Sequence, residues 1–338
     1  MKIACVTSPV LAVVLALPLD ATAQLPLPII DVHLHSLGAD DQGPPPLALC
    51  LPTTSFGAAS SGSSWGLELL TGYKDPPCAD PSWSPVTDDA LMEETVAIME
   101  RRNIIGVTSG PRRNAWQARV PERIIPGTQL FFNGVNPAPV EFMRARFTEG
   151  SVQVFAEVTI QYAGLEPTDP SLEPYFALAE ELDVPMGIHV GPGPPGAPYL
   201  FTPRYRARLH SPLLYEEILI RHPKLRLYLM HTGWPMLDDL LALMWAHPQV
   251  YVDLGMISWA LPPQELHRYL RTIVQAGFGD RVMFGSDHMV WPAALDFAID
   301  NIESADYLTE TQKRDIFYNN AARFLRLSDE QIARHHGR

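Results

Sequence analysis

Short apolar runs alternate with amphipathic helical stretches along most of the chain, and this alternation constrains the fold more than any other feature. Eight runs have the length of buried strands, and each ends near a polar residue, Gly or Pro. They occupy residues 29–33, 104–108, 124–132, 152–160, 184–189, 225–231, 250–254 and 282–285. Because these runs lack strict polar alternation, we expect parallel strands buried on both faces. An α/β fold of the (β/α)8 barrel type fits this pattern, and a doubly wound open sheet is the alternative.

Helical periodicity fills the gaps between these runs. In residues 88–102, Leu91, Thr95 and Met99 lie on one face of the predicted helix. Similar stretches occupy residues 140–147, 171–182, 212–221, 236–246, 263–276, 292–302 and 309–325. The single barrel domain is expected over residues 24–327. Residues 328–338 are expected to form a C-terminal tail, frayed from residue 331 onward.

The first residues have the features of a secretory signal peptide. Lys2 precedes an apolar stretch at residues 10–17, and the small-x-small sequence at 21–23 is typical of a cleavage site. The apolar stretch is too short to span a bilayer. We therefore expect residues 1–23 to be removed during export to the periplasm or the outside of the cell. The mature protein is expected to have no membrane segment.

A proline-rich segment, residues 43–85, directly follows the first predicted strand. In a barrel this connection lies on the face where active sites are built. Its length and composition favour an ordered lid over that face, and a decorative insertion is the alternative. Cys50 and Cys78 form an even pair in an exported chain, which favours a disulfide over two free thiols. Such a bridge would contribute roughly 3–4 kcal/mol in the chain-entropy model.

Ionisable side chains recur at the ends of the predicted strands. His33 and His35 lie two residues apart on one strand, so both imidazoles point to the same side. Later strands end with His189, His231 and Asp287. Burying so many ionisable groups is costly unless they are paired or bind metal. Imidazole with carboxylate ligands favours Zn²⁺, and Mn²⁺ and Fe²⁺ are the alternatives.

The charge balance limits the class of partner. The chain has 25 basic and 38 acidic residues, a net charge of −13. Nucleic-acid binding requires a basic surface, so this acidic balance argues against a nucleic-acid partner. A small-molecule substrate is expected instead. The fold class is compatible with a homodimer.

These motifs together resemble the amidohydrolase superfamily, and within it the amidohydrolase-related (amidohydrolase 2) family. The resemblance rests on IDVHLH at 30–35, GIH at 187–189, MHTG at 230–233, FGSD at 284–287 and NNAARFL at 319–325. The motifs occur in family order and span about residues 29–327. The resemblance implies a distorted (β/α)8 TIM barrel of the metal-dependent hydrolase type, with one or two metal ions.

The resemblance also implies roles for single residues. His33, His35 and His189 would be metal ligands, and His231 would bind a second metal or hold the substrate carbonyl. Asp287 would bind metal and act as general base. Many superfamily members have a carboxylated lysine on the fourth strand, where this chain has Glu157. Glu157 would either bridge two metals or lie behind the ligands.

The preferred reaction is hydrolysis of a small lactone, ester or amide. In this reaction the metal would activate the attacking water, and Asp287 would take a proton from it and give this proton to the leaving group. His231 would hold the substrate carbonyl. A nonoxidative decarboxylase of an aromatic or unsaturated acid is the second hypothesis, and it predicts cationic groups in the pocket. A noncatalytic metal-binding barrel is the third.

Other residues are weaker candidates for substrate contact. Arg204, with Arg206 and Arg208, follows the GPGPPG loop and would bind a substrate carboxylate, or is a solvated charged stretch. Trp234, His288 and Trp291 follow the metal motifs, and core packing explains them equally well. Asp253 either ends the seventh strand facing inward or caps a turn.

Overall fold

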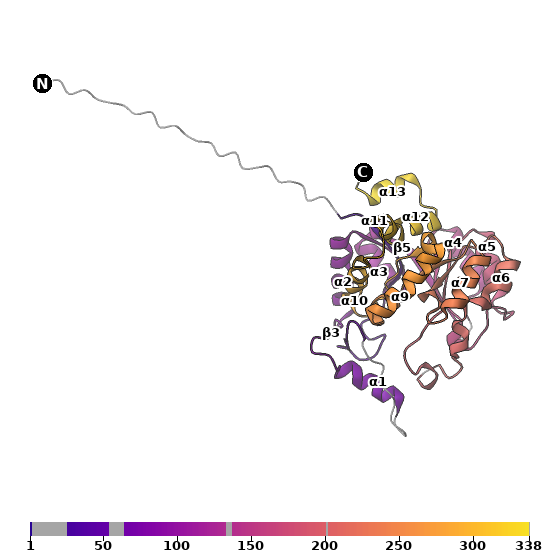
Figure 1. The fold of residues 1–338 in the computed structure, drawn as a ribbon, viewed down its shortest axis with the longest axis horizontal. Helices are drawn as coiled ribbons and strands as arrows, with labels where there is room; N and C mark the ends of the chain where they lie inside the picture. Colours follow the sequence, from indigo (N-terminus) through magenta and orange to yellow (C-terminus); the bar gives the residue numbers. More distant parts are fainter. Residues whose placement is uncertain (2–25, 54–63, 133–136, 201, 338) are drawn as a thin grey trace.

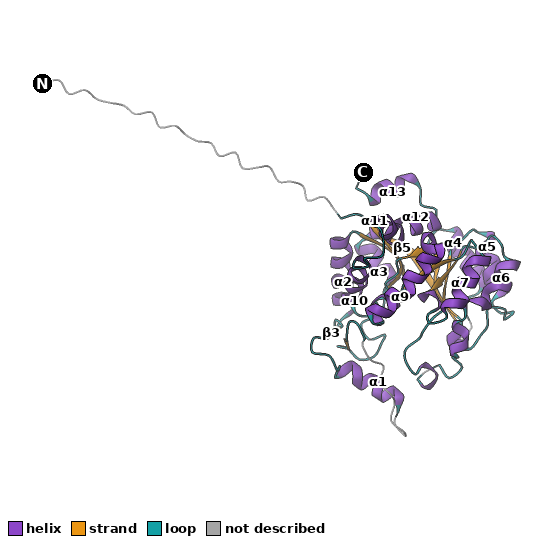
Figure 2. Cartoon of the chain, viewed as in Figure 1, coloured by secondary structure: helices purple, strands orange, loops and turns teal. Residues whose placement is uncertain are grey.

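The computed structural model describes residues 1, 26–53, 64–132, 137–200 and 202–337. Eight parallel strands follow one another around a single sheet. Figures 1 and 2 show this sheet inside a surrounding layer of helices. They are β1 (Ile29–His35), β4 (Ile104–Ser109), β5 (Ile124–Phe131), β6 (Val154–Thr159), β7 (Met186–His189), β8 (Leu227–Met230), β9 (Tyr251–Asp253) and β10 (Val282–Met283). The chain after β10 returns to β1, because Val32 N donates to Phe284 O at 3.0 Å. The expected barrel is confirmed, and the open sheet is excluded.

Helices surround this barrel. They are α2 (Asp88–Arg102), α3 (Arg113–Arg119), α4 (Val140–Thr148), α5 (Glu173–Glu181), α6 (Glu216–Arg221), α7 (Leu237–Ala246), α8 (Ile257–Ala260), α9 (Pro263–Ile273), α10 (Pro292–Glu303), α11 (Glu310–Arg314) and α12 (Asn320–Leu325). Short turns join them: η1 (Pro121–Arg123), η2 (Gln161–Ala163), η3 (Ala197–Tyr199), η4 (Ala207–His210), η5 (Pro212–Tyr215), η6 (His231–Gly233), η7 (Val274–Phe278), η8 (Gly279–Arg281) and η9 (Asp315–Asn319). Helix α3 was not predicted, since its sequence is mostly polar.

The end of the chain differs from the expectation of a frayed tail. Residues 329–335 form helix α13 (Asp329–His335), and Ser328 and Gln331 cap it reciprocally through their side chains and backbone amides. Asn103, just before β4, donates to His335 O at 3.3 Å. The prediction of a frayed end is therefore wrong for these residues, because a capping box and contacts with the barrel order them. Helix α13 lies at the end of the barrel where the strands begin (Figure 1).

The proline-rich segment lies at the opposite end, around α1 (Trp65–Lys74) (Figure 1). Strands β2 (Ala48–Leu49) and β3 (Ser82–Trp83) pair antiparallel at its base. A disulfide joins Cys50 and Cys78, as predicted. Most of the Ser/Gly-rich part falls at residues 54–63, outside the described residues.

The predicted signal peptide also lies outside the described residues, apart from residue 1. Among the helices of the described part, none is long and apolar enough to cross a membrane.

Candidate metal centre

His33 and His35 are presented by β1 and are both buried. His33 is held through its Nδ1, which donates to Asp253 Oδ2 at 3.0 Å. The other ring nitrogen of His33, Nε2, lies 3.7 Å from Asp287 Oδ1. His35 Nε2 lies 3.0 Å from the same oxygen. The two imidazoles therefore converge on one carboxylate, as their spacing on the strand predicts.

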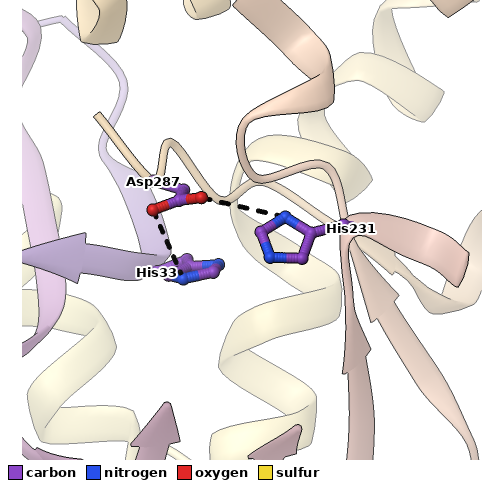
Figure 3. Close-up of side chains that lie close together, drawn as sticks. All are labelled: His33, His231 and Asp287. Carbon is purple, nitrogen blue, oxygen red and sulfur yellow. Dashed lines mark ion pairs between the residues drawn. The ribbon is translucent and has the colours of Figure 1, made fainter. Parts of the chain in front are cut away.

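His231 and Asp287 follow their strands rather than ending them. Strand β8 ends at Met230, and the first turn after it places His231 at φ 62°. Asp287 has φ 48° in the segment after β10. A non-glycine residue in this region is strained, and such strain is found mostly where the surrounding structure holds a functional side chain in place. Figure 3 shows His33 and His231 on either side of the Asp287 carboxylate.

The carboxylate of Glu157 lies between two groups of imidazoles. Its Oε1 contacts His189 Nδ1 and lies 3.9 Å from His231 Nε2. Its Oε2 lies 3.9 Å from His35 Nε2. His231 Nδ1 donates to Gly255 O at 2.9 Å, so its other ring nitrogen, Nε2, faces Glu157 and lies 3.0 Å from His189 Nδ1. One carboxylate oxygen thus faces His189 and His231, and the other faces the β1 pair.

The six predicted ligands come together in this way. Three sets of three residues each place their ligand atoms within 4.8 Å of one another. These sets are His33, His231 and Asp287; His33, His35 and Glu157; and Glu157, His189 and His231. Several ligand atoms are buried without a hydrogen-bond partner, namely His33 Nε2, both nitrogens of His35, His189 Nε2 and Asp287 Oδ1. Buried polar atoms are rarely left unpaired, so this donor set fits a divalent cation.

Electrostatics keep both carboxylates ionised. Burial alone would raise the pKa of Glu157, but the charge and hydrogen bond of His189 lower it well below its usual range. Burial likewise opposes the ionisation of Asp287, yet His33 and His35 lower the pKa of this carboxyl. Burial lowers the pKa of His33, but Asp287 and Asp253 outweigh it and raise the pKa to about 10. The ionised carboxylates therefore favour a positive charge at this position, which is what a candidate cation site requires.

Two further aspartates hold the ligands in place. Asp253 faces inward and also caps the turn, because its Oδ1 accepts from the backbone amides of His231 and Gly255, each at 2.9 Å. Asp31 Oδ1 accepts from the amides of His33 at 2.9 Å and Ser286 at 3.0 Å. Partners of this kind fix ring orientation and basicity in metal sites. Both alternatives proposed for Asp253 are thus realised together.

The four weaker candidates have contacts elsewhere. Arg204 is exposed, and Trp234 Nε1 donates to Glu265 Oε1 at 3.0 Å. Trp291 Nε1 donates to Leu47 O of the proline-rich segment at 3.0 Å. His288 is fully buried, and its Nε2 lies 3.5 Å from Thr95 Oγ1 of α2. Burial lowers the pKa of His288 to about 3, so this imidazole is neutral.

One aromatic residue beside the ligands was not predicted. Tyr162, in η2 directly after β6, places its ring centroid 4.8 Å from that of His189. Tyr205 also stacks on the Tyr162 ring, with ring centroids 5.5 Å apart. An aromatic residue just past a predicted strand end is a signal for this position, but only a weak one, because core packing produces the same pattern.

With this geometry established, comparison with known proteins identifies the family. The family model described as Amidohydrolase, the amidohydrolase 2 family, matches residues 30–327. The chain therefore belongs to this family and is a metal-dependent enzyme. A search of curated proteins finds no match.

The enzymes whose solved structures have the same fold catalyse different reactions. A 5-carboxyvanillate decarboxylase from Novosphingobium aromaticivorans, with bound manganese, is 13% identical, with 89% of this chain and 97% of that chain covered and a TM-score of 0.58. A 4-oxalomesaconate hydratase from Rhodopseudomonas palustris is 17% identical, with 90% and 98% covered and a TM-score of 0.54. A probable 2-pyrone-4,6-dicarboxylic acid hydrolase from Acinetobacter baumannii is 12% identical, with 88% and 99% covered and a TM-score of 0.54. At these identities the likeness is one of fold.

Proposed function

We propose that this protein is an exported hydrolase that cleaves a C–O or C–N bond next to the carbonyl of a small lactone, ester or amide. The observation that carries this proposal is the position of Asp287. Its Oδ1 is buried among the candidate ligand atoms, 3.0 Å from His35 Nε2 and 3.7 Å from His33 Nε2. An ionised carboxylate among ligand atoms is well placed to accept a proton from water.

The preferred cofactor is Zn²⁺, bound as two ions. The two oxygens of Glu157 face different imidazole groups, which supports a bridging role. His33, His35 and Asp287 would hold one ion, and His189 and His231 would hold the other. Mn²⁺ and Fe²⁺ are the alternatives. Because one structural neighbour contains bound manganese, the metal-loading experiment below includes Mn²⁺.

The side chains divide the chemical work. A divalent ion in such a site polarises a carbonyl oxygen and lowers the pKa of water from 15.7 to about 7. Asp287 then accepts the proton of the attacking water and delivers it to the leaving group. His231, with Nδ1 fixed on Gly255 O, keeps its Nε2 aimed into the centre and aids in holding the carbonyl. Every group in this scheme is oriented by a backbone or carboxylate contact.

Decarboxylation of a carboxylic acid predicts a cationic group near the ligands. Arg206 donates to Pro203 O at 2.9 Å, and Arg208 pairs with Glu166 at 3.3 Å. Of the three arginines that would bind a substrate carboxylate, Arg206 is thus bound within its own loop and Arg208 is paired with the loop after β6. This favours hydrolysis over decarboxylation for the present site.

Export is part of the proposal. The signal-like residues 1–23 motivate it, and the disulfide between Cys50 and Cys78 supports it, because such bridges persist in oxidising compartments. Nonreducing peptide mapping and N-terminal sequencing of the secreted protein test this part. Free thiols or an intact Lys2 in exported protein would contradict it.

The metal count is the first experiment. Metal per chain is measured on the purified mature protein and on Glu157→Ala after loading with Zn²⁺ or Mn²⁺. We expect two ions, falling to about one in the variant, because the bridging carboxylate is lost. One ion in both proteins would make Glu157 a supporting residue and favour decarboxylation. No bound metal after loading would refute the proposed centre.

The reaction is tested with a panel containing dihydrocoumarin, phenyl acetate, acetanilide and 5-carboxyvanillate. We expect hydrolysis of a lactone, ester or amide without release of CO₂. Asp287→Asn should lower kcat roughly 10²–10⁴-fold, the usual contribution of a general base, and retain most of the metal. Full activity in this variant would remove Asp287 from the role of base.

A further inference from the structure

Tyr162 lies against a ligand of the proposed metal centre without being a ligand itself. Its ring is tilted by 48° to that of His189 at a centroid distance of 4.8 Å. The residue is half-buried and follows β6, the strand that carries Glu157. Its side chain therefore lies at the carboxyl end of the barrel strands, where substrates bind in this fold.

A second tyrosine holds this ring in place. Tyr205 stacks on Tyr162 at an interplanar angle of 28°. The hydroxyl of Tyr205 accepts from Gly193 N at 2.9 Å and donates to Nε2 of His210. Both hydrogen-bonding capacities of Tyr205 are thus used inside the protein. Its function in this arrangement is to support the neighbouring ring.

Gly193 completes the support. A Cβ at this position would lie 2.8 Å from Cε1 and 2.9 Å from the hydroxyl oxygen of Tyr162. Such contacts are shorter than real side chains tolerate, so only glycine lets the loop after β7 pack on the ring. Tyr162 therefore packs against three residues, His189, Tyr205 and Gly193.

The hydroxyl of Tyr162 differs from that of Tyr205. Within the described part of the chain it makes no hydrogen bond, whereas the hydroxyls of Tyr175, Tyr228 and Tyr269 each donate to a backbone carbonyl. Burial, with the nearby charge of Glu157, raises the pKa of Tyr162 well above its usual range, so the phenol keeps its proton at neutral pH and is a hydrogen-bond donor. A held donor beside the metal ligands is the kind of group that stabilises negative charge developing on a substrate oxygen.

We propose that Tyr162 contacts the substrate and donates a hydrogen bond from its hydroxyl to a carbonyl or anionic oxygen of the molecule held at the metal centre. Tyr205 is a positioning residue that acts through the Tyr162 ring. This inference rests on the proposed metal centre, but it applies to any substrate that presents an oxygen there. It adds a protein donor to a site built from the six candidate ligands and the residues that hold them.

The test uses binding of acetohydroxamate to the Co²⁺-loaded mature protein, followed by the visible absorption of Co²⁺. Acetohydroxamate presents an anionic oxygen and needs no turnover. We expect Tyr162→Phe to bind this probe about tenfold more weakly, the loss of one hydrogen bond to a charged oxygen, with unchanged Co²⁺ content. Tyr205→Phe and Gly193→Ala should also weaken probe binding, because they free or displace the ring.

Tyr175→Phe is the matched control, since its hydroxyl donates to Ala138 O and its ring packs against Phe132. It should bind the probe as the wild type does. Equal dissociation constants for wild type and Tyr162→Phe would overturn the inference, as would the absence of probe binding by the loaded wild type. Loss of Co²⁺ in Tyr162→Phe would also overturn it, by making the residue a support of His189. Probe binding that depends on Tyr162 without turnover of the substrate panel would instead contradict the proposed hydrolysis alone.

Discussion

Asp253 shows how much one buried carboxylate organises in this centre. Its Oδ2 accepts from His33 Nδ1, and its Oδ1 accepts from the amides of His231 and Gly255. One side chain therefore orients a ligand from β1 and the turn that carries a ligand after β8. The two ligands are far apart in sequence, and this carboxylate couples them.

Replacing Asp253 by Asn should weaken metal binding. The Asn side chain has one oxygen, which accepts hydrogen bonds, and one NH2 group, which only donates them. Either His33 Nδ1–H or the two backbone amides would then face this NH2 group and lose their acceptor. We expect metal affinity to fall about 10–100-fold, the usual effect of losing such a partner. Competition with a chromogenic chelator measures it. Asp296→Asn, a surface carboxylate paired with Arg102, is the control and should leave metal affinity unchanged.

His210 should make stability dependent on pH. Burial, with a smaller contribution from the charges of His189 and His231, lowers the pKa of His210 to about 4. In the unfolded chain its pKa is about 6.5. Between these values the unfolded state binds the proton and the folded state does not, so folding stability falls as pH falls from about 6.5 to about 4.

The comparison of wild type with His210→Gln isolates this contribution from those of the other histidines. The difference in free energy of unfolding, measured by urea denaturation, should be larger at about pH 7 than at about pH 5. A difference that does not change with pH would show that His210 does not titrate in this way.

At the scale of elements, the described part of the proline-rich segment, residues 43–53 and 64–85, is held to the barrel by specific contacts. Leu47 O accepts from Trp291 Nε1, and Leu47 N donates to Ser84 Oγ at 2.9 Å. On its outer side, a Cβ at Gly66 of α1 would lie 3.4 Å from Leu200 in the loop after β7. The segment thus reaches the second loop that borders the metal centre, and we propose that the two together cover it.

Removing the disulfide should loosen this cover. We expect the double variant Cys50→Ser, Cys78→Ser to lose up to roughly 3–4 kcal/mol of stability, because the crosslink no longer restricts the unfolded chain. Cleavage by a protease should shift to residues 43–85. Urea unfolding and limited proteolysis with mass spectrometry measure the two effects. An unchanged cleavage pattern would show that Trp291 and the β2–β3 pair suffice to hold the segment.

At the scale of the whole molecule, the barrel brings together groups that the isolated elements cannot pair. Parallel strands end at one face, so side chains from β1, β6, β7 and the segments after β8 and β10 meet there. The same closure buries four imidazoles and two carboxylates in a small volume. The fold therefore carries a cost in desolvation that a bound cation offsets.

Metal removal should lower thermal stability for this reason. A ligand at 1,000 times its dissociation constant stabilises the folded state by about 4 kcal/mol. We expect the midpoint of thermal unfolding to drop by several degrees in the presence of a chelator and to recover on adding Zn²⁺. His33→Ala should show little of this response. A wild-type midpoint that is insensitive to metal would contradict a site of this affinity.

Much of the fold was predictable because its signals are local. Every predicted strand is present, although most are shorter, and α2 has the predicted bounds of 88–102. Helix α3 was missed because it is short and polar, and α13 because a capping box at a chain end was not weighed against fraying. The stretch at 309–325 is helical but interrupted by a π turn, η9. Such interruptions depend on packing and leave no periodic signal.

The sequence by itself predicted the class of barrel and the six candidate ligands that the structure brings together, because strand periodicity and the place of a residue at a strand end are local properties. Only the tertiary structure decided that Glu157 faces two imidazole groups, that Asp253 holds His33, and that Tyr162 lies on His189. The tertiary structure also decided that His288 contacts α2 and that Trp291 contacts the proline-rich segment. These contacts join residues distant along the chain, and their geometry depends on the strained turns after the strands and on how the barrel closes.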